Sequence, residues 1–301
     1  VAPEISKGFQ ATDNGYLLLD EEEKDALLLA EPEAAAWIRP YSMGVEFINN
    51  IPRYCLWLVD ITPNELRSLP KIKERVSNCQ KWRSEAPKTG DAFKLKDIPH
   101  LFRPCKQFRD VPYIAVPLVS SSQRRYMPMG FIKNGMIPGN NLFSIFNANL
   151  YQFGVLMSNV HMAWMRAVCG RLKSDYRYTG KIVYNNFPWC NPTAEQKKKI
   201  EETAQAILDA RALYPDCSLA DLYDEVAMPP ELRKAHQAND RAVMQAYGFD
   251  VKTMTESSCV AELMKIYQLK TAVLVLNTYA KIQNAKCKLV KLVLVSKQAN
   301  Y

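Results

Sequence analysis

Residues 149–170 read NLYQFGVLMSNVHMAWMRAVCG and are apolar almost without a break. A stretch that is long and apolar on every side predicts a helix buried within the core. Gly170 is the expected end of this helix, because glycine commonly terminates helices. We expect the helix to be the scaffold of a domain, with Met157, Met162 and Trp164 as core side chains rather than ligand contacts.

The sequence before this helix mixes helix and strand signals. Residues 20–38, DEEEKDALLLAEPEAAAWI, begin with acids and continue with apolar residues at helical spacing, which predicts a short helix. The apolar runs 53–61, RYCLWLVDI, and 111–119, VPYIAVPLV, predict buried strands. Residues 128–141 are rich in Gly, Pro and Asn and predict turns or a hairpin. These elements together predict a mixed α/β domain over residues 1–190.

After Trp189 the sequence changes from mixed helix and strand signals to helix signals alone. Thr193 and Gln196 have the spacing of a capping box, and apolar residues follow at helical spacing. Ser218 is suited to cap a second helix, and the pair Pro229–Pro230 to start a third. We therefore predict an α+β fold in which a small helical subdomain, residues 191–268, follows the first domain. Residues 269–301 carry lysines and no acids, and they are expected to form a basic tail.

Composition narrows the class of protein. The chain has 39 Lys and Arg against 31 Asp and Glu, a formal charge of +8, which favours a polyanionic partner. Its eight cysteines form no C-x-x-C pair, and its three histidines are far apart, so no metal site is expected. No apolar run is long enough for a membrane span and the first residues do not resemble a signal peptide. The sequence predicts a cytoplasmic protein without a membrane partner.

Catalytic motifs are missing from the sequence. It contains neither a G-x-x-x-x-G-K-[ST] loop nor a G-x-G-x-x-G turn, and its serine-rich stretch lacks a G-x-S-x-G elbow. The order of residues in NNFPW, 185–189, differs from the Asn-Pro-Pro-aromatic motif of amino-methyltransferases. We therefore assign no catalytic residue and no cofactor to this chain.

Residues 170–180, GRLKSDYRYTG, place charge at every second position. In one extended strand Arg171, Lys173, Asp175 and Arg177 would project from the same face. Lysine and arginine suit guanine, and a carboxylate accepts from cytosine N4, so Lys173 and Asp175 together could read one G·C pair in DNA. A solvated edge strand is the alternative interpretation.

The flanking residues suit contacts to the DNA backbone. Small hydroxyl side chains and guanidinium groups bind phosphates and set the register of a protein on DNA. From this stretch and from VSSSQRRYMP, 119–128, the expected backbone contacts are Ser120, Ser121, Ser122, Arg124, Arg125, Arg171, Ser174, Tyr176, Tyr178 and Lys181. Asn140 and Asn141 have amides that could pair with adenine, although turn chemistry explains them equally well.

Four long motifs in the chain resemble those of the MmeI-like DNA methyltransferases. They are WIRPYSMGVEFINNIPRYCLWL, VSSSQRRYMPMGF, GRLKSDYRYTGKIVYNNFPW and SLADLYDEVAMPPELRKAHQANDRAV. The resemblance covers roughly residues 8–268 and corresponds to the target recognition and C-terminal parts of these single-chain restriction-modification enzymes. It implies base reading by Lys173 with Asp175, by Arg177 with Asn141, and by Asn140 with Leu118.

The resemblance also implies adenine-N6 methylation with S-adenosylmethionine, in some members beside a nuclease. Those activities belong to upstream domains whose motifs this chain does not contain. The prediction is therefore a module that binds double-stranded DNA, selects the target sequence and docks beside a methyltransferase domain. The alternatives are a non-catalytic protein-interaction module and a general RNA-binding module.

Overall fold

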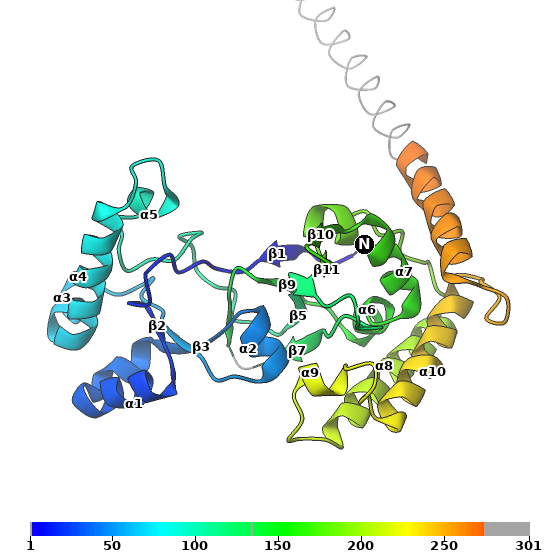
Figure 1. The fold of residues 1–301 in the computed structure, drawn as a ribbon, viewed down its shortest axis with the longest axis horizontal. Coiled ribbons are helices and arrows are strands. Elements are labelled where there is room, and N and C mark those ends of the chain that lie inside the picture. The colour runs from blue at the N-terminus through cyan, green and yellow to red at the C-terminus, as the bar shows by residue number, and fades with distance from the viewer. Residues whose placement is uncertain (1, 134, 274–301) are drawn as a thin grey trace, which may run out of the picture.

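The computed structural model describes residues 2–133 and 135–273 of the chain (Figure 1). The described residues combine helices with three small sheets, which confirms the predicted α+β fold. One lobe carries α1, α3, α4 and α5, and the other carries α6, α7, α8 and α10, with a sheet between them (Figure 1).

The helices and strands have the following bounds. The helices are α1 (Glu21–Ala30), η1 (Pro32–Trp37), α2 (Gly44–Asn49), α3 (Pro63–Ser68), α4 (Pro70–Glu85), α5 (Asp91–Lys94), α6 (Leu150–Leu156), α7 (Asn159–Val168), η2 (Gly180–Tyr184), α8 (Ala194–Ala212), α9 (Leu219–Leu222) and α10 (Pro230–Ala246). The strands are β1 (Ile5–Lys7), β2 (Leu18–Leu19), β3 (Ile38–Ser42), β4 (Tyr54–Leu56), β5 (Tyr113–Pro117), β6 (Val119–Ser120), β7 (Gly130–Ile132), β8 (Ile137–Pro138), β9 (Leu142–Phe146), β10 (Gly170–Leu172) and β11 (Asp175–Arg177). Residues 256–273 form a further helix at the end of the described chain.

The sheet between the lobes has the antiparallel strand order β1-β9-β5-β7. Strand β5 is buried along its whole length, as the apolar run that contains it predicts. Because side chains alternate along a strand, Ile114 and Val116 pack on one face, whereas Tyr113 and Ala115 pack on the other. The sheet therefore contributes to the packing of both lobes.

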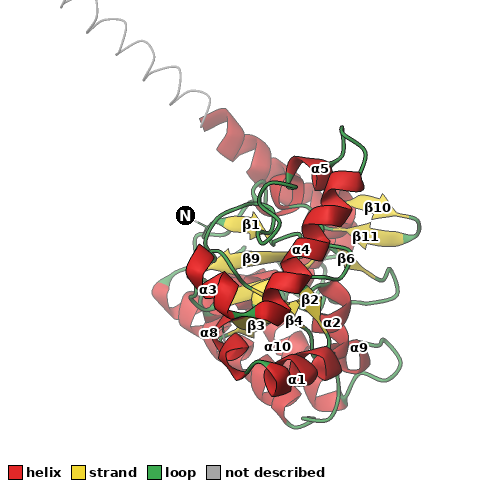
Figure 2. Cartoon of the chain, turned by 90° about the vertical axis from the view of Figure 1, so that its left-hand side faces the viewer, coloured by secondary structure: helices red, strands yellow, loops and turns green. Residues whose placement is uncertain are grey.

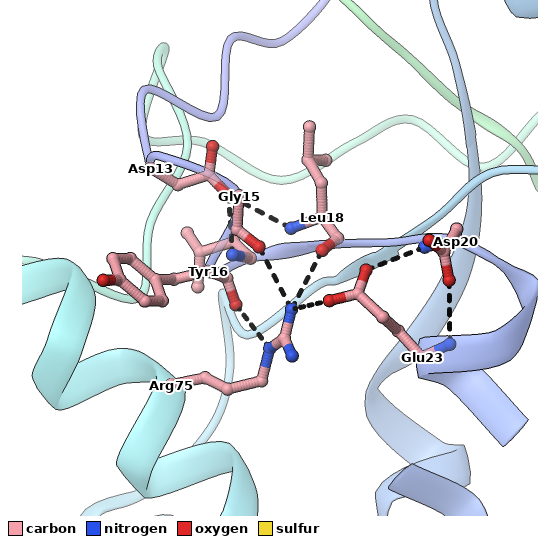
Figure 3. Close-up of polar contacts among 8 residues, drawn as sticks. Asp13, Gly15, Tyr16, Leu18, Asp20, Glu23 and Arg75 are labelled. Carbon is pink, nitrogen blue, oxygen red and sulfur yellow. Dashed lines mark hydrogen bonds and ion pairs between the residues drawn. The ribbon is translucent and has the colours of Figure 1, made fainter. Parts of the chain in front are cut away.

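The first lobe is built on the sheet β2-β4-β3-β8, whose apolar side chains pack against α1 and α4. Arg75 of α4 fixes the turn before β2: its Nε donates to Tyr16 O at 2.8 Å and its Nη2 to Gly15 O at 3.0 Å (Figure 3). On the other side of this turn, Asp13 accepts from Leu17 N at 2.6 Å. Charge-assisted hydrogen bonds to backbone groups are strong and directional, so they fix this turn against α4.

The apolar scaffold is two helices rather than the single helix expected over residues 149–170. The helical geometry ends after Leu156, and the Ser158 hydroxyl caps α7 by accepting from His161 N. Serine is favoured at the N-cap of a helix, because its side-chain oxygen accepts a hydrogen bond from a backbone N–H that has no partner within the helix. The prediction of one continuous helix is therefore wrong. Its predicted end is also wrong, because Gly170 begins strand β10 and does not end a helix. Its prediction of burial is confirmed for both helices.

The C-terminal helices follow the capping signals in the sequence. Thr193 and Gln196 form the predicted capping box, Ser218 caps α9, and α10 begins at Pro230. Side chains from α6, α7, α8 and α10 share one hydrophobic core, so the packing is continuous across residue 190.

The first residues of the expected basic tail, whose order the sequence left open, are helical. Residues 269–273 continue the helix that starts at residue 256. The rest of that expected tail, residues 274–301, lies outside the described residues.

Candidate nucleic-acid interface

Strands β10 and β11 form a hairpin whose two-residue turn is Lys173–Ser174. Lys173 has a φ of +55°, and Arg171 stabilises the turn by donating from Nη1 to Ser174 O at 3.0 Å. The hairpin projects from the body of the molecule beside β6 (Figure 2). The expectation of one strand with four charges on one face is therefore wrong, because the chain reverses direction at Lys173.

The hairpin register redistributes the charged side chains. Arg171 pairs with Tyr176, and its guanidinium lies 3.9 Å from the centre of the Tyr176 ring. Leu172 pairs with Asp175, so Leu172, Asp175 and Arg177 share the opposite face. Arg171 is thus separated from the side chains with which the sequence grouped it, and its guanidinium interacts with the hairpin itself.

Lys173 and Asp175 lie together at the tip of the hairpin. Lys173 is exposed and Asp175 is half-buried. Asp175 Oδ1 accepts a hydrogen bond from Ser122 N at 3.2 Å. Its Oδ2 has no hydrogen-bond donor within the described chain. An ionised carboxylate can accept several hydrogen bonds, so Asp175 keeps acceptor capacity for a ligand.

Leu118 joins the hairpin to the loop that carries the two asparagines. Its backbone N–H donates to Asn141 O at 2.8 Å, and its carbonyl accepts from Tyr178 N at 2.8 Å. The next residue along the chain, Val119, pairs with Arg177 of β11. Main-chain hydrogen bonds therefore bring together three segments that are far apart in the sequence.

The asparagine turn is held against the first lobe. Asn140 is half-buried and Asn141 is exposed. The preceding Gly139 is packed so tightly that a Cβ there would clash with Met43 Cγ and lie 2.6 Å from Tyr41 Oη. Only glycine allows this approach, so Gly139 fixes the place where the two asparagines emerge. We call Leu118, Asn140, Asn141, Lys173, Asp175 and Arg177 the reading surface.

The loop 121–125 lies beside the reading surface. Arg124 N donates to Ser121 O at 3.2 Å, which closes a turn. Ser122, Arg124 and Arg125 line a pocket of about 550 Å³ that extends to α7 and to residues 254–259. Burial lowers the pKa of Arg124, and the nearby carboxylates of Asp224 and Asp175 oppose this effect.

A buried polar network fixes the end of this loop. Tyr126 Oη donates to Asp240 Oδ2 at 2.6 Å, and Asn159 N donates to Asp240 Oδ1 at 2.7 Å. His236 stacks on Tyr126 with ring centres 4.1 Å apart. Burial raises the pKa of Asp240 to about 6, against the effect of its hydrogen bonds. Tyr126, which directly follows the two arginines of the loop, is thus anchored in the core formed with the C-terminal helices.

Three of the expected phosphate contacts are buried. Ser120, Tyr176 and Tyr178 expose 3%, 8% and 0% of their surface. The Tyr178 hydroxyl lies 3.1 Å from His161 Nε2 and has no route to solvent. Side chains so covered have a structural role, and the expectation that these three bind phosphates is wrong for this conformation. Ser174 and Lys181, in contrast, are exposed.

The pairing of His161 with Tyr178 escaped the sequence analysis. His161 is fully buried, and its burial lowers its pKa to about 3, so the ring is neutral at physiological pH. The contact supports the base of the hairpin, because Tyr178 directly follows β11. Its only signal in the sequence is the polar side chain of His161 within an otherwise apolar stretch, which does not identify the partner.

Neither a metal cluster nor a membrane helix is found in the part of the chain that the structure describes. Across residues 2–133 and 135–273, histidine, cysteine and carboxylate side chains form no group that could hold a metal ion. Over the same ranges, no helix combines the length and the apolar character needed to cross a membrane.

Comparison with known proteins gives consistent matches along the chain. Residues 1–191 match the family model "MmeI, target recognition domain", and residues 192–275 match "MmeI, C-terminal domain". DNA methyltransferase A of Bacillus subtilis (strain 168) is 36% identical over 269 residues, which are 89% of this chain and 30% of that protein. A solved structure of the type IIL restriction-modification enzyme MmeI in complex with DNA aligns with a TM-score of 0.85 and 39% identity. It covers 90% of this chain and 36% of the MmeI chain. The chain thus spans about a third of the length of these relatives.

Proposed function

Because the chain belongs to the MmeI family, with its target recognition and C-terminal domains, we propose that it selects the DNA sequence on which a restriction-modification enzyme acts. The reading surface would enter a groove of duplex DNA. Residues 1–190 would supply the contacts to bases, and the helices of residues 191–268 would hold them in place. The arrangement at Leu118 carries the proposal, since its main-chain hydrogen bonds bring the asparagine turn beside the strand that carries Asp175 and Arg177.

The chemistry of the hairpin tip supports a G·C pair as one recognised position. The Lys173 ammonium can donate to guanine O6 and N7, while the free oxygen of Asp175 can accept from cytosine N4. We assign a second position to Arg177 with Asn141. The third is assigned to Asn140 with Leu118. The second and third assignments pair side chains on neighbouring segments of the reading surface.

The exposed and half-buried polar residues around the reading surface suit the DNA backbone. Guanidinium, ammonium and hydroxyl groups bind phosphates without regard to sequence and fix the register of a protein on DNA. The proposed backbone contacts are Ser121, Ser122, Arg124, Arg125, Arg171, Ser174 and Lys181. Arg171 uses only one of its N–H donors, on Nη1, for the hairpin turn, so the other donors could bind a phosphate.

The parent enzyme would be an adenine-N6 methyltransferase that uses S-adenosylmethionine, and a methyltransferase domain would be the protein partner of this chain. The residues described do not fit the cofactor. The pocket beside the reading surface carries three guanidinium groups, Arg124, Arg125 and Arg166, against two carboxylates, and this excess of positive charge disfavours a sulfonium cation. No cofactor-binding role is therefore assigned here. Since DNA is the proposed substrate, the expected location is cytoplasmic.

Selection from a library of randomised DNA duplexes tests the proposal. The purified chain should enrich one short duplex motif that contains a G·C pair, and structured RNA or single-stranded DNA should compete poorly. A variant in which Lys173 and Asp175 are both alanine should lose preference at one position while keeping its affinity for phosphates. Enrichment of no motif, or equal binding of RNA, would support a general RNA-binding or protein-interaction module instead.

A further inference from the structure

The loop 106–109 is held against the edge of the sheet by an aromatic anchor. The ring of Phe108 lies 6.2 Å from Phe9, 6.1 Å from Tyr113 and 6.2 Å from Phe146, measured between ring centres. The neighbouring Gln107 also binds a side chain of the first lobe, because its amide donates to the Asp60 carboxylate. With two adjacent residues fixed, the cationic residues on either side of them, at positions 106 and 109, have defined places.

A hollow of about 190 Å³ lies beneath this loop, beside strands β1 and β9. One liquid water molecule occupies about 30 Å³, so the hollow has room for a phosphate group and a few waters. Ser144 of β9 lines the hollow and is only 1% exposed, yet its hydroxyl has no hydrogen-bond partner. Buried hydroxyls are nearly always paired, so the orphaned Ser144 Oγ is a sign of a ligand.

Positive charge surrounds the same hollow. Lys7, Lys106 and Arg109 line it, against the single carboxylate of Glu4. None of these three cations forms an ion pair with a described residue. The Arg109 guanidinium instead lies 5.4 Å from the centre of the Phe146 ring, which holds it over the strand. A hydroxyl donor combined with excess cationic charge is the chemistry of an anion site.

Strand β9 connects the hollow to the reading surface, because it carries Ser144 and directly follows Asn141. Ser144 is three residues beyond Asn141, about 10 Å along an extended strand. This distance is close to the width of the DNA major groove, about 12 Å. Strand β1 is the outer strand of its sheet, and in Figure 2 it lies toward the side of the molecule opposite the β10–β11 hairpin.

From these observations we infer that Lys7, Lys106, Arg109 and Ser144 form a second binding site, which takes a backbone phosphate of the same duplex. The inference rests on the proposed function, because it requires that the reading surface binds DNA. The site fixes the register of the duplex from the side opposite the hairpin. It contributes affinity for every sequence and no preference among bases.

Removal of the two loop cations tests the site. The double variant Lys106→Gln/Arg109→Gln is compared with the full wild-type chain on its selected duplex and on a scrambled duplex. We expect equal weakening on both duplexes and a shallower dependence of log K on log salt, by about 0.9 for each phosphate that the variant no longer neutralises. Lys198→Gln is the matched control, since Lys198 is exposed on α8 and outside the site; it should leave the slope unchanged.

Neutral backbone substitutions locate the contact. Methylphosphonate is placed at one phosphate at a time. One position should weaken binding by the wild-type chain and have no effect on the double variant. Ser144→Ala should weaken binding at that same position while leaving the melting temperature of the free protein unchanged or higher, because it removes an unpaired buried hydroxyl.

Three outcomes would overturn the inference. The first is a double variant with the salt slope of the wild type. The second is a result in which inorganic phosphate binds the wild-type chain and not the double variant, while both proteins bind DNA with the same affinity. The ligand of the site would then be a free anion. The third is a methylphosphonate profile that is identical for the two proteins. Failure of the proposed function differs from all three, because the wild-type chain would then select no duplex sequence at all.

Discussion

Asp175 Oδ1 accepts a hydrogen bond from the backbone N–H of Ser122 at 3.2 Å, and this contact joins the tip of the hairpin to the loop 121–125. The bond depends on an acceptor at position 175. It orients the carboxylate before any DNA arrives, so less side-chain freedom is lost on binding. Under the proposed function, one carboxylate would thus join the contacts to bases with the contacts to the DNA backbone.

Exchange of the two residues at the hairpin tip should change the preferred base. In Lys173→Asp/Asp175→Lys the donor and the acceptor trade places, so the preference at one base pair should shift, with about 1–3 kcal/mol at stake. Lysine at position 175 cannot accept from Ser122, so total affinity should also fall. Binding to duplexes that vary at each position measures both effects. Equal weakening on all duplexes would leave these residues a phosphate role only.

Tyr178→Phe should lower stability without altering the phosphate contacts. The change removes the hydroxyl beside His161 Nε2 and leaves a buried nitrogen without a partner, at a cost of about 1–3 kcal/mol in the free energy of unfolding. Denaturant titration measures this decrease. The salt dependence of DNA binding should remain that of the wild type, whereas Lys181→Gln, at an exposed position, should reduce the slope by about 0.9. A shallower dependence of log K on log salt in Tyr178→Phe would instead indicate that Tyr178 contacts a phosphate of the DNA.

The burial of His161 predicts that acid destabilises the protein. Its pKa is lowered from 6.5 to about 3 in the folded state, so between these values the unfolded chain binds the proton first. The contribution of His161 to the free energy of unfolding should therefore fall as the pH decreases below 6.5, by about 2 kcal/mol at pH 5. Asp240 acts in the opposite direction, because its pKa is raised to about 6 in the folded state.

Denaturant titrations at several pH values measure this dependence. His161→Gln, which keeps a polar partner for Tyr178, should reduce the fall. His236 is buried and also has a lowered pKa, so part of the dependence should remain. An unchanged pH profile in His161→Gln would contradict the assignment.

Gly154 should resist substitution because α6 and α8 touch at this residue. A Cβ at this position would lie 2.7 Å from Ile200 Cγ2 and 3.1 Å from Ala204 Cβ, which forces the helices apart. Gly154→Ala should cost about 1–3 kcal/mol in the free energy of unfolding. Gly170→Ala is the control, since a Cβ there would meet no atom within 4 Å and its φ is not positive. Equal stability of the two variants would argue against this packing.

The helices at the C-terminal end could be predicted because their signals are local. The capping box of Thr193 with Gln196 depends on residues three positions apart, and Pro230 at a helix start depends on its own ring. The break at Ser158 is equally local, but the apolar residues on both sides concealed it. Periodicity indicates that a segment is buried, whereas one polar cap decides where a helix is interrupted.

The hairpin could not be predicted from its own residues. Its turn has lysine rather than glycine or asparagine in the left-handed region, so the usual signal of a two-residue hairpin is missing. The pairing of Arg171 with Tyr176 and of Val119 with Arg177 stabilises the reversal, and the second of these contacts spans almost sixty residues. The spacing of charges singled out this segment as a candidate interface, but contacts with residues outside the segment determine which side chains share a face.

Leu118 gathers the reading surface through main-chain atoms alone, since its N–H and its carbonyl make the two connecting hydrogen bonds. No side chain on that surface is required for those two bonds. Under the proposed function, a gene of this kind would acquire a new target by a few codon changes, with the framework inherited intact. For the same reason, a laboratory would redesign one letter of the target at a time.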